Sequence, residues 1–396
     1  MKQRIIISTS LEKDLTLAIS ECEHDKVFVL ADETTIDKCW PVIKDFRILK
    51  NAQTIVIGAT DTNKTLESLA HVWKALGDGG ATRHSCLINL GGGMVTDLGG
   101  FAASTFKRGI DFINIPTSLL AMVDASVGGK TGINFNGLKN EVGVFNDAKY
   151  VILDTNFLKT LDDDNLRSGY AEMLKHGLIS DDAHLAELLN FQLSAPNYQQ
   201  LQQMVAHSVE IKENVVELDP HERAIRKALN LGHTFGHAFE SWALKRKPIL
   251  HGHAVAYGLV CELYLSCIKT GFPTERMRQS VRFIRENYPH LAFTCDDYDE
   301  LIALMTHDKK NTAGVINFTL LSAVGEIMIN QTATTEEIKE ALDFYRESYG
   351  SEERRTKNED RRIKFPWGWV RCSSAASLSL SFPLFPSFLS SFPFNS

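Results

Sequence analysis

The segment CLINLGGGMVTDLGGFAASTFKRG (Cys86–Gly109) decides the fold, because three consecutive glycines join an apolar run to a helical pattern. Residues without Cβ let backbone N–H groups approach a pyrophosphate closely, and the N-terminus of the following helix adds partial positive charge. Thr96 stands where the GxGxxG motif has its last glycine, so the segment alone fits a plain tight turn about as well. Its position after an apolar strand favours a dinucleotide-binding turn at the carboxyl end of a parallel strand.

Short apolar runs flank this segment on both sides and alternate with amphipathic stretches. Such alternation is typical of a parallel sheet wrapped by helices. We therefore predict an α/β, Rossmann-like nucleotide-binding domain over residues 1–154. The predicted strands are RIIIST (4–9), KVFVLAD (26–32), QTIVIGA (53–59), CLINLGGG (86–93), DFINIPTS (111–118) and YVILD (150–154).

Beyond this domain the apolar pattern changes to helical periodicity, as in LRSGYAEMLKHGLI (166–179). An extended pair, VINFTLL (315–321) and GEIMIN (325–330), interrupts the helices before the last one. We predict a mostly α-helical second domain over 155–350. The cleft between two such domains is a natural ligand site.

The last part of the chain, residues 351–396, departs from this pattern. Residues 351–371 are charged without periodicity, and 373–396 are a low-complexity run of Ser, Phe, Leu and Pro. We interpret the segment as a disordered or non-native extension that builds no core of its own. A membrane-touching tail is the alternative, but its prolines interrupt an amphipathic helix. They are Pro383, Pro386 and Pro393.

The composition is that of a soluble globular protein, with 44% hydrophobic and 23% charged residues among 396. A net charge of −7 argues against a general nucleic-acid partner. The seven cysteines include no CxxC pair, so we expect reduced thiols in a cytoplasmic protein rather than disulfides or a cysteine zinc site. The sequence shows neither a signal peptide nor an apolar run of membrane-spanning length, so we expect no membrane partner.

A second glycine-rich segment, DASVGGKTGINFNGLKN (Asp124–Asn140), looks like the end of a phosphate-binding P-loop. The match fails, because Asp124 stands where the motif has its first glycine and no strand leads directly into the segment. Lys130 and Lys139 still lie on a glycine-rich loop, where they suit an anionic ligand. A solvated surface loop explains them equally well.

Histidines gather around LNLGHTFGHAFE (Leu229–Glu240), where His233 and His237 lie four residues apart and therefore on one helix face. Catalytic zinc needs three protein ligands and an open position, and mixed His/Glu sets satisfy this. The spacing favours His233 with His237 but cannot decide the set, and a lone Glu172 in an apolar helix more often faces solvent. The open candidates are Glu172, His176, His233, His237, His251 and His253.

Together these segments resemble the 3-dehydroquinate synthase family of sugar-phosphate cyclases. Seven motifs carry the resemblance, in the family's order and over about residues 25–345. They are LGGGMVTDLGGFAASTFKRGI, IPTSLLAMVDASVGGKTGIN, GLKNEVGVF, GYAEMLKHGLI, RKALNLGHTFGHAFE, LHGHAVAYG and HDKKNTAG. Linked motifs are specific where each alone is weak, so we expect the family's fold, activity and cofactors.

The resemblance also implies the roles of site residues. Zn²⁺ or Co²⁺ would be held by Glu172, His233 and His251, while His237, Glu222 and Lys130 would act in catalysis. His237 would handle protons beside the metal without binding it, which suits an imidazole. Substrate contacts would be Arg108, Asp124, Lys130, Lys139, Asn140, Lys175, Lys212, Arg226, Asn230, His237 and Lys309, with Lys310 as the alternative to Lys309. NAD contacts would be Asp32, Asp61, Lys64, Gly92, Gly93, Asp97, Thr117, Ser118, Lys139, Asn140, Phe157, Thr160 and Leu161.

The implied reaction converts 3-deoxy-D-arabino-heptulosonate 7-phosphate into 3-dehydroquinate and phosphate, in the shikimate pathway to aromatic amino acids. It combines transient NAD-dependent oxidation, phosphate elimination, reduction and intramolecular aldol closure, so NAD is regenerated in each cycle. The substrate carries a carboxylate and a phosphate, which agrees with the many expected cations. In the family's homodimer, Arg108 would reach the phosphate across the subunit interface.

Three features depart from the commoner family pattern. His253 replaces a glutamate two residues after His251, and it lies either just behind the metal or on the surface. Asp61 and Lys64 stand in place of the usual GExxK, and Asn165 stands where the family often has a glutamate near the nucleotide. None of these changes removes an expected metal ligand or substrate cation.

Three other functions compete with this one. A metal-dependent polyol or alcohol dehydrogenase would share the architecture and NAD, but an uncharged polyol needs no lysine cluster. Another sugar-phosphate cyclase, forming an inosose or a valiolone, would differ at the contacts to the substrate carboxylate, notably Arg226 and the lysine of HDKKN. A binding protein without turnover would lack metal-ligand positions, and all three are occupied here.

Overall fold

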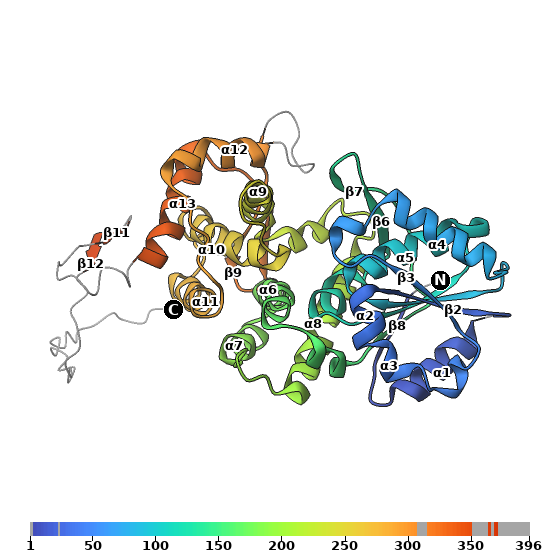
Figure 1. Ribbon diagram of the computed structural model, residues 1–396. Coiled ribbons are helices and arrows are strands. Elements are labelled where there is room, and N and C mark those ends of the chain that lie inside the picture. The colour runs from blue at the N-terminus through green and yellow to red at the C-terminus, as the bar shows by residue number, and fades with distance from the viewer. Residues whose placement is uncertain (1–2, 23, 307–314, 351–362, 366–367, 371–396) are drawn as a thin grey trace, which may run out of the picture. The chain divides into compact units, whose positions relative to one another are not determined.

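All six predicted strands are confirmed, and they form one parallel sheet in the order β1-β8-β5-β4-β2-β3 in the computed structural model (Figure 1). Strands β2, β4 and β8 are buried along their whole length, which explains why each is mostly apolar. Because all strands run the same way, their carboxyl ends meet at one edge. The strands are β1 (Arg4–Ile7), β2 (Val27–Asp32), β3 (Gln53–Ile57), β4 (Cys86–Gly91), β5 (Asp111–Pro116) and β8 (Tyr150–Leu153).

The structure describes residues 3–22, 24–306, 315–350, 363–365 and 368–370. Contacts group Met1–Tyr349 into one compact unit, so the division predicted between residues 154 and 155 stays a prediction. The unit Gly350–Ser396 contains an antiparallel pair of strands, β11 (Ile363–Phe365) and β12 (Gly368–Val370). Most of 351–396 lies outside the described residues, and its interpretation as an extension also stays a prediction.

Helices cover both faces of the sheet, with α1 and α3 on one face and α4 and α5 on the other (Figure 1). Helix α5 begins at Gly93, directly after β4, and Gly92 is its N-cap without a side-chain hydrogen bond. The helices of this half are α1 (Leu11–Glu21), α2 (Glu33–Lys38), α3 (Trp40–Ile43), α4 (Leu66–Asp78) and α5 (Gly93–Thr105). Single turns are η1 (Arg47–Leu49), η2 (Asp61–Asn63), η3 (Phe106–Arg108) and the π-helical η4 (Ala121–Ala125).

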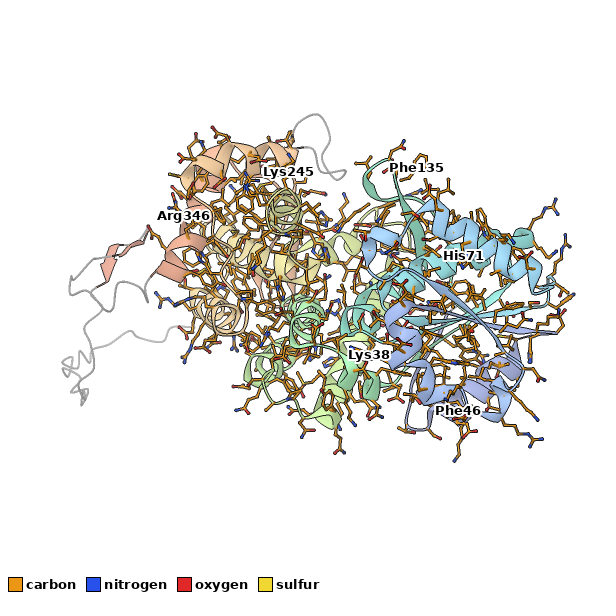
Figure 2. The ribbon with its side chains drawn as sticks, in the orientation of Figure 1. Lys38, Phe46, His71, Phe135, Lys245 and Arg346 are labelled. Atoms are coloured by element: carbon orange, nitrogen blue, oxygen red, sulfur yellow. The ribbon has the colours of Figure 1, made fainter. Side chains whose placement is uncertain are left out.

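The second glycine-rich segment was predicted to be a loop. In the structure it continues into an antiparallel hairpin of β6 (Lys130–Phe135) and β7 (Leu138–Phe145). Asn136 and Gly137 form its two-residue turn, with φ angles of 50° and 77°. Asn-Gly favours this positive-φ turn, so a hairpin signal was present in the sequence. Every residue of β7 is exposed, and Figure 2 shows Phe135 at the outer end of the hairpin. The prediction was wrong because an exposed strand shows no alternation of buried and polar residues.

The second half of the first unit is mostly helical, as predicted, and its extended pair is confirmed as an antiparallel hairpin of β9 and β10. The helices are α6 (Asp163–Ser180), α7 (Asp182–Asn190), α8 (Tyr198–Leu218), α9 (His233–Leu244), α10 (His251–Thr270), α11 (Thr274–Asn287), α12 (Tyr298–Thr306) and α13 (Thr335–Gly350). The remaining elements are η5 (Thr155–Thr160), η6 (Ile225–Asn230), η7 (Cys295–Asp297), β9 (Phe318–Ala323) and β10 (Glu326–Gln331). Among the described residues, no helix combines the length and apolar character that a bilayer crossing requires.

Two glycines of α10 let three helices approach one another closely. A Cβ at Gly252 would lie 1.8 Å from the carbonyl oxygen of Ser168 on α6, and a Cβ at Gly258 would lie 1.9 Å from that of Gly232, just before α9. Any larger residue would therefore push the helices apart. These two backbone contacts set the close spacing of α6, α9 and α10, the three helices that carry the candidate site.

Candidate active site

Three predicted metal ligands come together from three helices. Glu172 lies on α6, whereas His233 and His251 are the first residues of α9 and α10. The Nε2 atoms of His233 and His251 lie 3.4 Å and 3.5 Å from Glu172 Oε1, and the three possible ligand atoms lie within 4.8 Å of one another. One carboxylate and two imidazoles can hold a divalent ion and leave a position open for a substrate.

Glu172 is fully buried, so the expectation that a lone glutamate here faces solvent is wrong. Its Oε2 contacts the ammonium of Lys175, and its Oε1 faces the Nε2 atoms of His233 and His251. Burial raises the pKa of Glu172, but Lys175 and His233 outweigh it and hold the pKa well below its ordinary value. Lys175 compensates one side of this buried, ionised carboxylate, and its Oε1 faces two imidazoles, which fits a metal site.

The two histidines are held by their other ring nitrogens. His233 Nδ1 donates to the carbonyl oxygen of Leu231 at 3.1 Å, and His251 Nδ1 donates to Glu240 Oε2 at 3.1 Å. Burial lowers the pKa of His251, yet hydrogen bonds to Glu172 and Glu240 raise it to about 10. The two carboxylates therefore favour a positive charge between them, which a divalent metal would supply.

His237 lies one helical turn beyond His233, beside the three ligands. Its ring centroid is 5.3 Å from that of His233 and 5.9 Å from that of His251. His237 is not among the groups of described residues whose ligand atoms lie close enough to share one ion. The spacing of four residues thus brings His237 to the site without bringing it into the ligand cluster.

A second group of possible ligands consists of Asp124, Glu172 and His176. Lys212 Nζ lies 2.6 Å from Asp124 Oδ1. Burial raises the pKa of Asp124, but Lys212 outweighs it and holds the pKa well below its ordinary value. Burial and Lys175 lower the pKa of His176 to about 3, so this imidazole is neutral. The lysines already supply positive charge on this side, which leaves the first group as the better metal site.

The predicted substrate cations lie on the Asp124 side of the cluster. Lys175 contacts Glu172, and both side chains are almost completely buried. Arg226 is 3% exposed, and carbonyl oxygens hold its guanidinium, with Nη1 donating to Pro220 at 2.6 Å and Nη2 to Gly128 at 3.2 Å. Such buried cations suit an anionic ligand with several charges.

Glu222 links two further predicted contacts. Lys130 Nζ lies 2.6 Å from Glu222 Oε2, and Asn230 Nδ2 donates to Glu222 Oε1 at 2.8 Å. The backbone of Glu222 has a φ of 56°, in the left-handed region that non-glycine residues rarely adopt. Strained residues of this kind cluster at functional sites.

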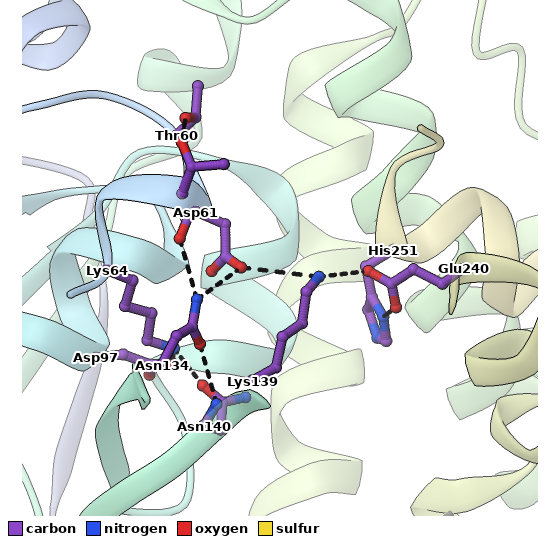
Figure 3. Close-up of polar contacts among 10 residues, drawn as sticks. Thr60, Asp61, Lys64, Asp97, Asn134, Lys139, Asn140, Glu240 and His251 are labelled. Atoms are coloured by element: carbon purple, nitrogen blue, oxygen red, sulfur yellow. Dashed lines mark hydrogen bonds and ion pairs between the residues drawn. The ribbon is translucent and has the colours of Figure 1, made fainter. Parts of the chain in front are cut away.

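The predicted nucleotide contacts lie around the hairpin and the end of β4. Lys64 is buried and contacts both Asp97 and Asn140 Oδ1, while Asn134 Nδ2 donates to Asp61 (Figure 3). Burial raises the pKa of Asp97, with Lys64 opposing the shift. The N-terminus of α5 at Gly93 has no side-chain cap, so its N–H groups can receive a phosphate, which fits a dinucleotide.

Several other predicted contacts surround these elements at the carboxyl edge of the sheet. Asp32 ends β2 and caps α2, and Thr117 and Ser118 follow β5. A Cβ at Gly92 would lie 3.4 Å from Ser118 Oγ, so the two loops adjoin. Phe157, Thr160 and Leu161 belong to η5 and the residue after it.

Arg108 does not join this cluster, and one further predicted contact falls outside the residues that the structure describes. Arg108, with a φ of 71°, lines a separate cavity of about 510 Å³ together with Arg83, His84 and Lys107. A position apart from the cluster is what we expect if Arg108 reaches the substrate of a partner subunit. That role stays a prediction. Lys309, with its alternative Lys310, lies outside the described residues.

His253 is buried, which rules out the surface alternative. Its ring packs edge-on against Tyr288, with 5.5 Å between centroids, and burial lowers its pKa. His253 therefore belongs to the packing between α10 and the end of α11.

Two carboxylates of the site were missed from the sequence, Glu240 and Glu262. Glu240 lies seven residues after His233, which is two helical turns along one face, so spacing could have suggested it. Glu262 is fully buried on α10 and accepts hydrogen bonds from the backbone N–H groups of Gly232 at 2.6 Å and Thr234 at 3.0 Å. It thereby fastens the start of α9, which carries His233, to the helix that carries His251.

Glu262→Ala is expected to lower the free energy of unfolding by about 2–3 kcal/mol, because buried N–H groups at a helix start lose their acceptor. Urea unfolding in the presence of a chelator measures this without any contribution from a bound metal. Glu262→Gln keeps an acceptor and should lose less. An unchanged unfolding midpoint in Glu262→Ala would show that the contact contributes nothing to stability.

Comparisons with known proteins agree with this site. Family models described as 3-dehydroquinate synthase N-terminal and C-terminal match residues 54–168 and 169–311. The 3-dehydroquinate synthase of Parabacteroides distasonis is 56% identical over 350 residues, covering 88% of this chain and 99% of that protein. A 2-epi-5-epi-valiolone synthase from Streptomyces hygroscopicus subsp. jinggangensis, solved with NAD⁺ and Zn²⁺ bound, superposes with a TM-score of 0.76 and 26% identity over 88% of this chain and 97% of that one.

A 2-deoxy-scyllo-inosose synthase, solved with carbaglucose-6-phosphate, NAD⁺ and Co²⁺, shares the fold. It superposes with a TM-score of 0.74 and 23% identity, over 86% of this chain and 95% of that one. The two family models and the Parabacteroides relative together span most of the unit Met1–Tyr349. The chain belongs to the 3-dehydroquinate synthase family.

Proposed function

We propose that this chain is a carbon–oxygen lyase that converts 3-deoxy-D-arabino-heptulosonate 7-phosphate into 3-dehydroquinate and phosphate, as a step of the shikimate pathway. One structural observation supports this most strongly. The carboxylate of Glu172 belongs to the metal-ligand cluster and also contacts Lys175, one of the buried cations. A polyol site would need the ligands alone, whereas an acidic, phosphorylated sugar needs both ligands and cations.

Each part of the substrate has a candidate partner in the chain. Lys130, Lys175, Lys212 and Arg226 would bind its phosphate and carboxylate, and their contacts to Glu172 and Asp124 keep two of them in place without substrate. When bound, NAD would accept and return a hydride, and a divalent metal held by Glu172, His233 and His251 would lower the pKa of a substrate hydroxyl.

Two residues are proposed to move protons. His237 lies beside the ligands and can act as a proton donor or acceptor at the substrate. Glu222, held between Lys130 and Asn230, is the second candidate, since its carboxylate faces the residues expected to bind the substrate. The contact with Lys130 shows that Glu222 lies in a polar part of the site.

We further infer that zinc or cobalt is the metal and that the protein is a cytoplasmic homodimer. Carboxylate and imidazole ligands suit both ions. The dimer is supported by the separate position of Arg108 and by apolar side chains exposed on the β6–β7 hairpin. Those side chains are Phe135, Leu138, Val142, Val144 and Phe145.

Phosphate release from the heptulosonate phosphate tests the proposal. With zinc and NAD present in catalytic amount, we expect many phosphates per NAD and no accumulation of NADH, because the hydride returns to the substrate. The same sugar phosphate without its carboxylate serves as the control and should react far more slowly. Absence of phosphate release would sink the proposal. NADH formed in step with substrate loss would indicate a dehydrogenase, and equal rates with the control sugar would indicate another cyclase.

A further inference from the structure

Glu240 connects the candidate metal ligands to the β6–β7 hairpin. It lies on α9 with its side chain 10% exposed. Its Oε2 accepts a hydrogen bond from His251 Nδ1 at 3.1 Å, and its Oε1 lies 2.6 Å from Lys139 Nζ (Figure 3). One carboxylate therefore touches a candidate ligand and a candidate nucleotide contact at the same time.

The contact to His251 controls which ring nitrogen faces the metal position. A proton on Nδ1 that is donated to Glu240 leaves Nε2 without a proton when the ring is neutral. Nε2 is the atom that points toward Glu172 Oε1, at 3.5 Å. Histidines that bind metals commonly donate their other N–H to a carboxylate in this way, which fixes the ring and strengthens it as a ligand.

The contact to Lys139 comes from the opposite side. Lys139 is half exposed, and its Nζ also lies 3.7 Å from Asp61 Oδ2. Asp61 accepts a hydrogen bond from Asn134 Nδ2, and Asn134 Oδ1 accepts one from the backbone N–H of Asn140 at 3.0 Å (Figure 3). The side chain of Asn140 contacts Lys64, which in turn contacts Asp97. A continuous series of polar contacts thus runs from the nucleotide side of the site to His251 through Glu240.

We propose that Glu240 is a positioning residue that holds His251 in its metal-binding orientation. The inference rests on the proposed function only in that the same cluster holds the metal. Metal binding without substrate tests it separately from turnover. A wild-type protein that binds zinc but releases no phosphate would sink the proposed function and leave this proposal standing.

Zinc affinity of purified protein, measured by competition with a chromophoric chelator, is the first test. Glu240→Ala should raise the Kd for Zn²⁺ about 10- to 100-fold, the usual effect of removing such a partner. Glu240→Gln keeps an acceptor for His251 but loses the charge, so a smaller increase of several-fold is expected. The visible spectrum of the Co²⁺-loaded protein should shift in Glu240→Ala, because the ligand geometry changes.

Two control variants test whether an effect on zinc affinity comes from the loss of a negative charge or from the loss of the ion pair between Glu240 and Lys139. Glu300→Gln removes one negative charge from an ion pair with Arg246, outside the site, and should leave the Kd unchanged. Lys139→Met breaks the ion pair but keeps the bond to His251, so zinc affinity should stay within about threefold of wild type, well inside the 10- to 100-fold loss expected for Glu240→Ala.

The proposal is overturned if Glu240→Ala binds zinc like wild type and its cobalt spectrum is unchanged. A merely structural role would lower the melting temperature of the chelated protein without changing either readout in the folded fraction. If Glu240→Ala fails to fold, Glu240→Gln decides, and a Kd equal to that of wild type in the Gln variant overturns the proposal. Loss of affinity in Lys139→Met equal to that in Glu240→Ala would also overturn it, because the ion pair would then be the cause.

Discussion

Glu172→Gln is expected to abolish stoichiometric metal binding and to reduce phosphate release by about three orders of magnitude or more. The amide has the same shape but no charge, so the ligand cluster keeps only two imidazoles. A bound metal contributes several kcal/mol of charge stabilisation, and each 1.36 kcal/mol is about tenfold in rate. Metal analysis of the purified variant and the phosphate assay measure the two effects on one preparation.

The buried partner of Glu172 complicates this experiment and also supplies its control. Lys175 contacts Glu172, and breaking a buried ion pair costs about 3–5 kcal/mol because the other charge is left without compensation. Adding Lys175→Met to Glu172→Gln removes that charge and should restore stability without restoring metal. A stable double variant without zinc assigns the loss to the ligand rather than to unfolding. Full zinc occupancy in Glu172→Gln would remove this residue from the ligand set.

The sheet could be predicted from the sequence because its inner strands are buried and therefore mostly apolar, as β2 and β4 are. The β6–β7 hairpin gave no such signal, since β7 is exposed along its whole length. Its one local signal, the Asn136–Gly137 turn, lies inside a segment whose other glycines favour a loop. The hairpin became visible only through its pairing, which sequence periodicity does not report.

The candidate site was less accessible to residue-level reasoning. Helix α6 is buried on almost every side around Glu172, so no polar face distinguishes a buried ligand from a solvated glutamate. Glu172, His233 and His251 belong to three helices whose closeness depends on backbone contacts at Gly252 and Gly258. Only the family resemblance grouped these three residues, and the structure brings the same three together.

The spacing of His233 and His237 leads to the second large effect. We expect His237→Ala to keep its zinc while phosphate release falls by about 10²–10⁴-fold, the usual contribution of a general acid or base. The ring of His237 lies 5.3 Å from that of His233, close enough to act on a metal-bound substrate. The ligand cluster of Glu172, His233 and His251 is complete without it. Metal content and the pH profile of the rate should therefore separate the two histidines.

His237→Gln and His233→Gln form the matched pair for this test, because the same substitution is made one turn apart on α9. The variant at 237 should retain stoichiometric zinc and lose the part of the pH profile that reflects proton transfer, with a larger change in kcat than in KM. The variant at 233 should lose zinc and activity together. If both variants lose zinc, His233 and His237 bind the same ion. His251, which donates to Glu240, would then contact the substrate instead of the metal. Because the two arrangements differ in which variant keeps its metal, metal analysis alone decides between them.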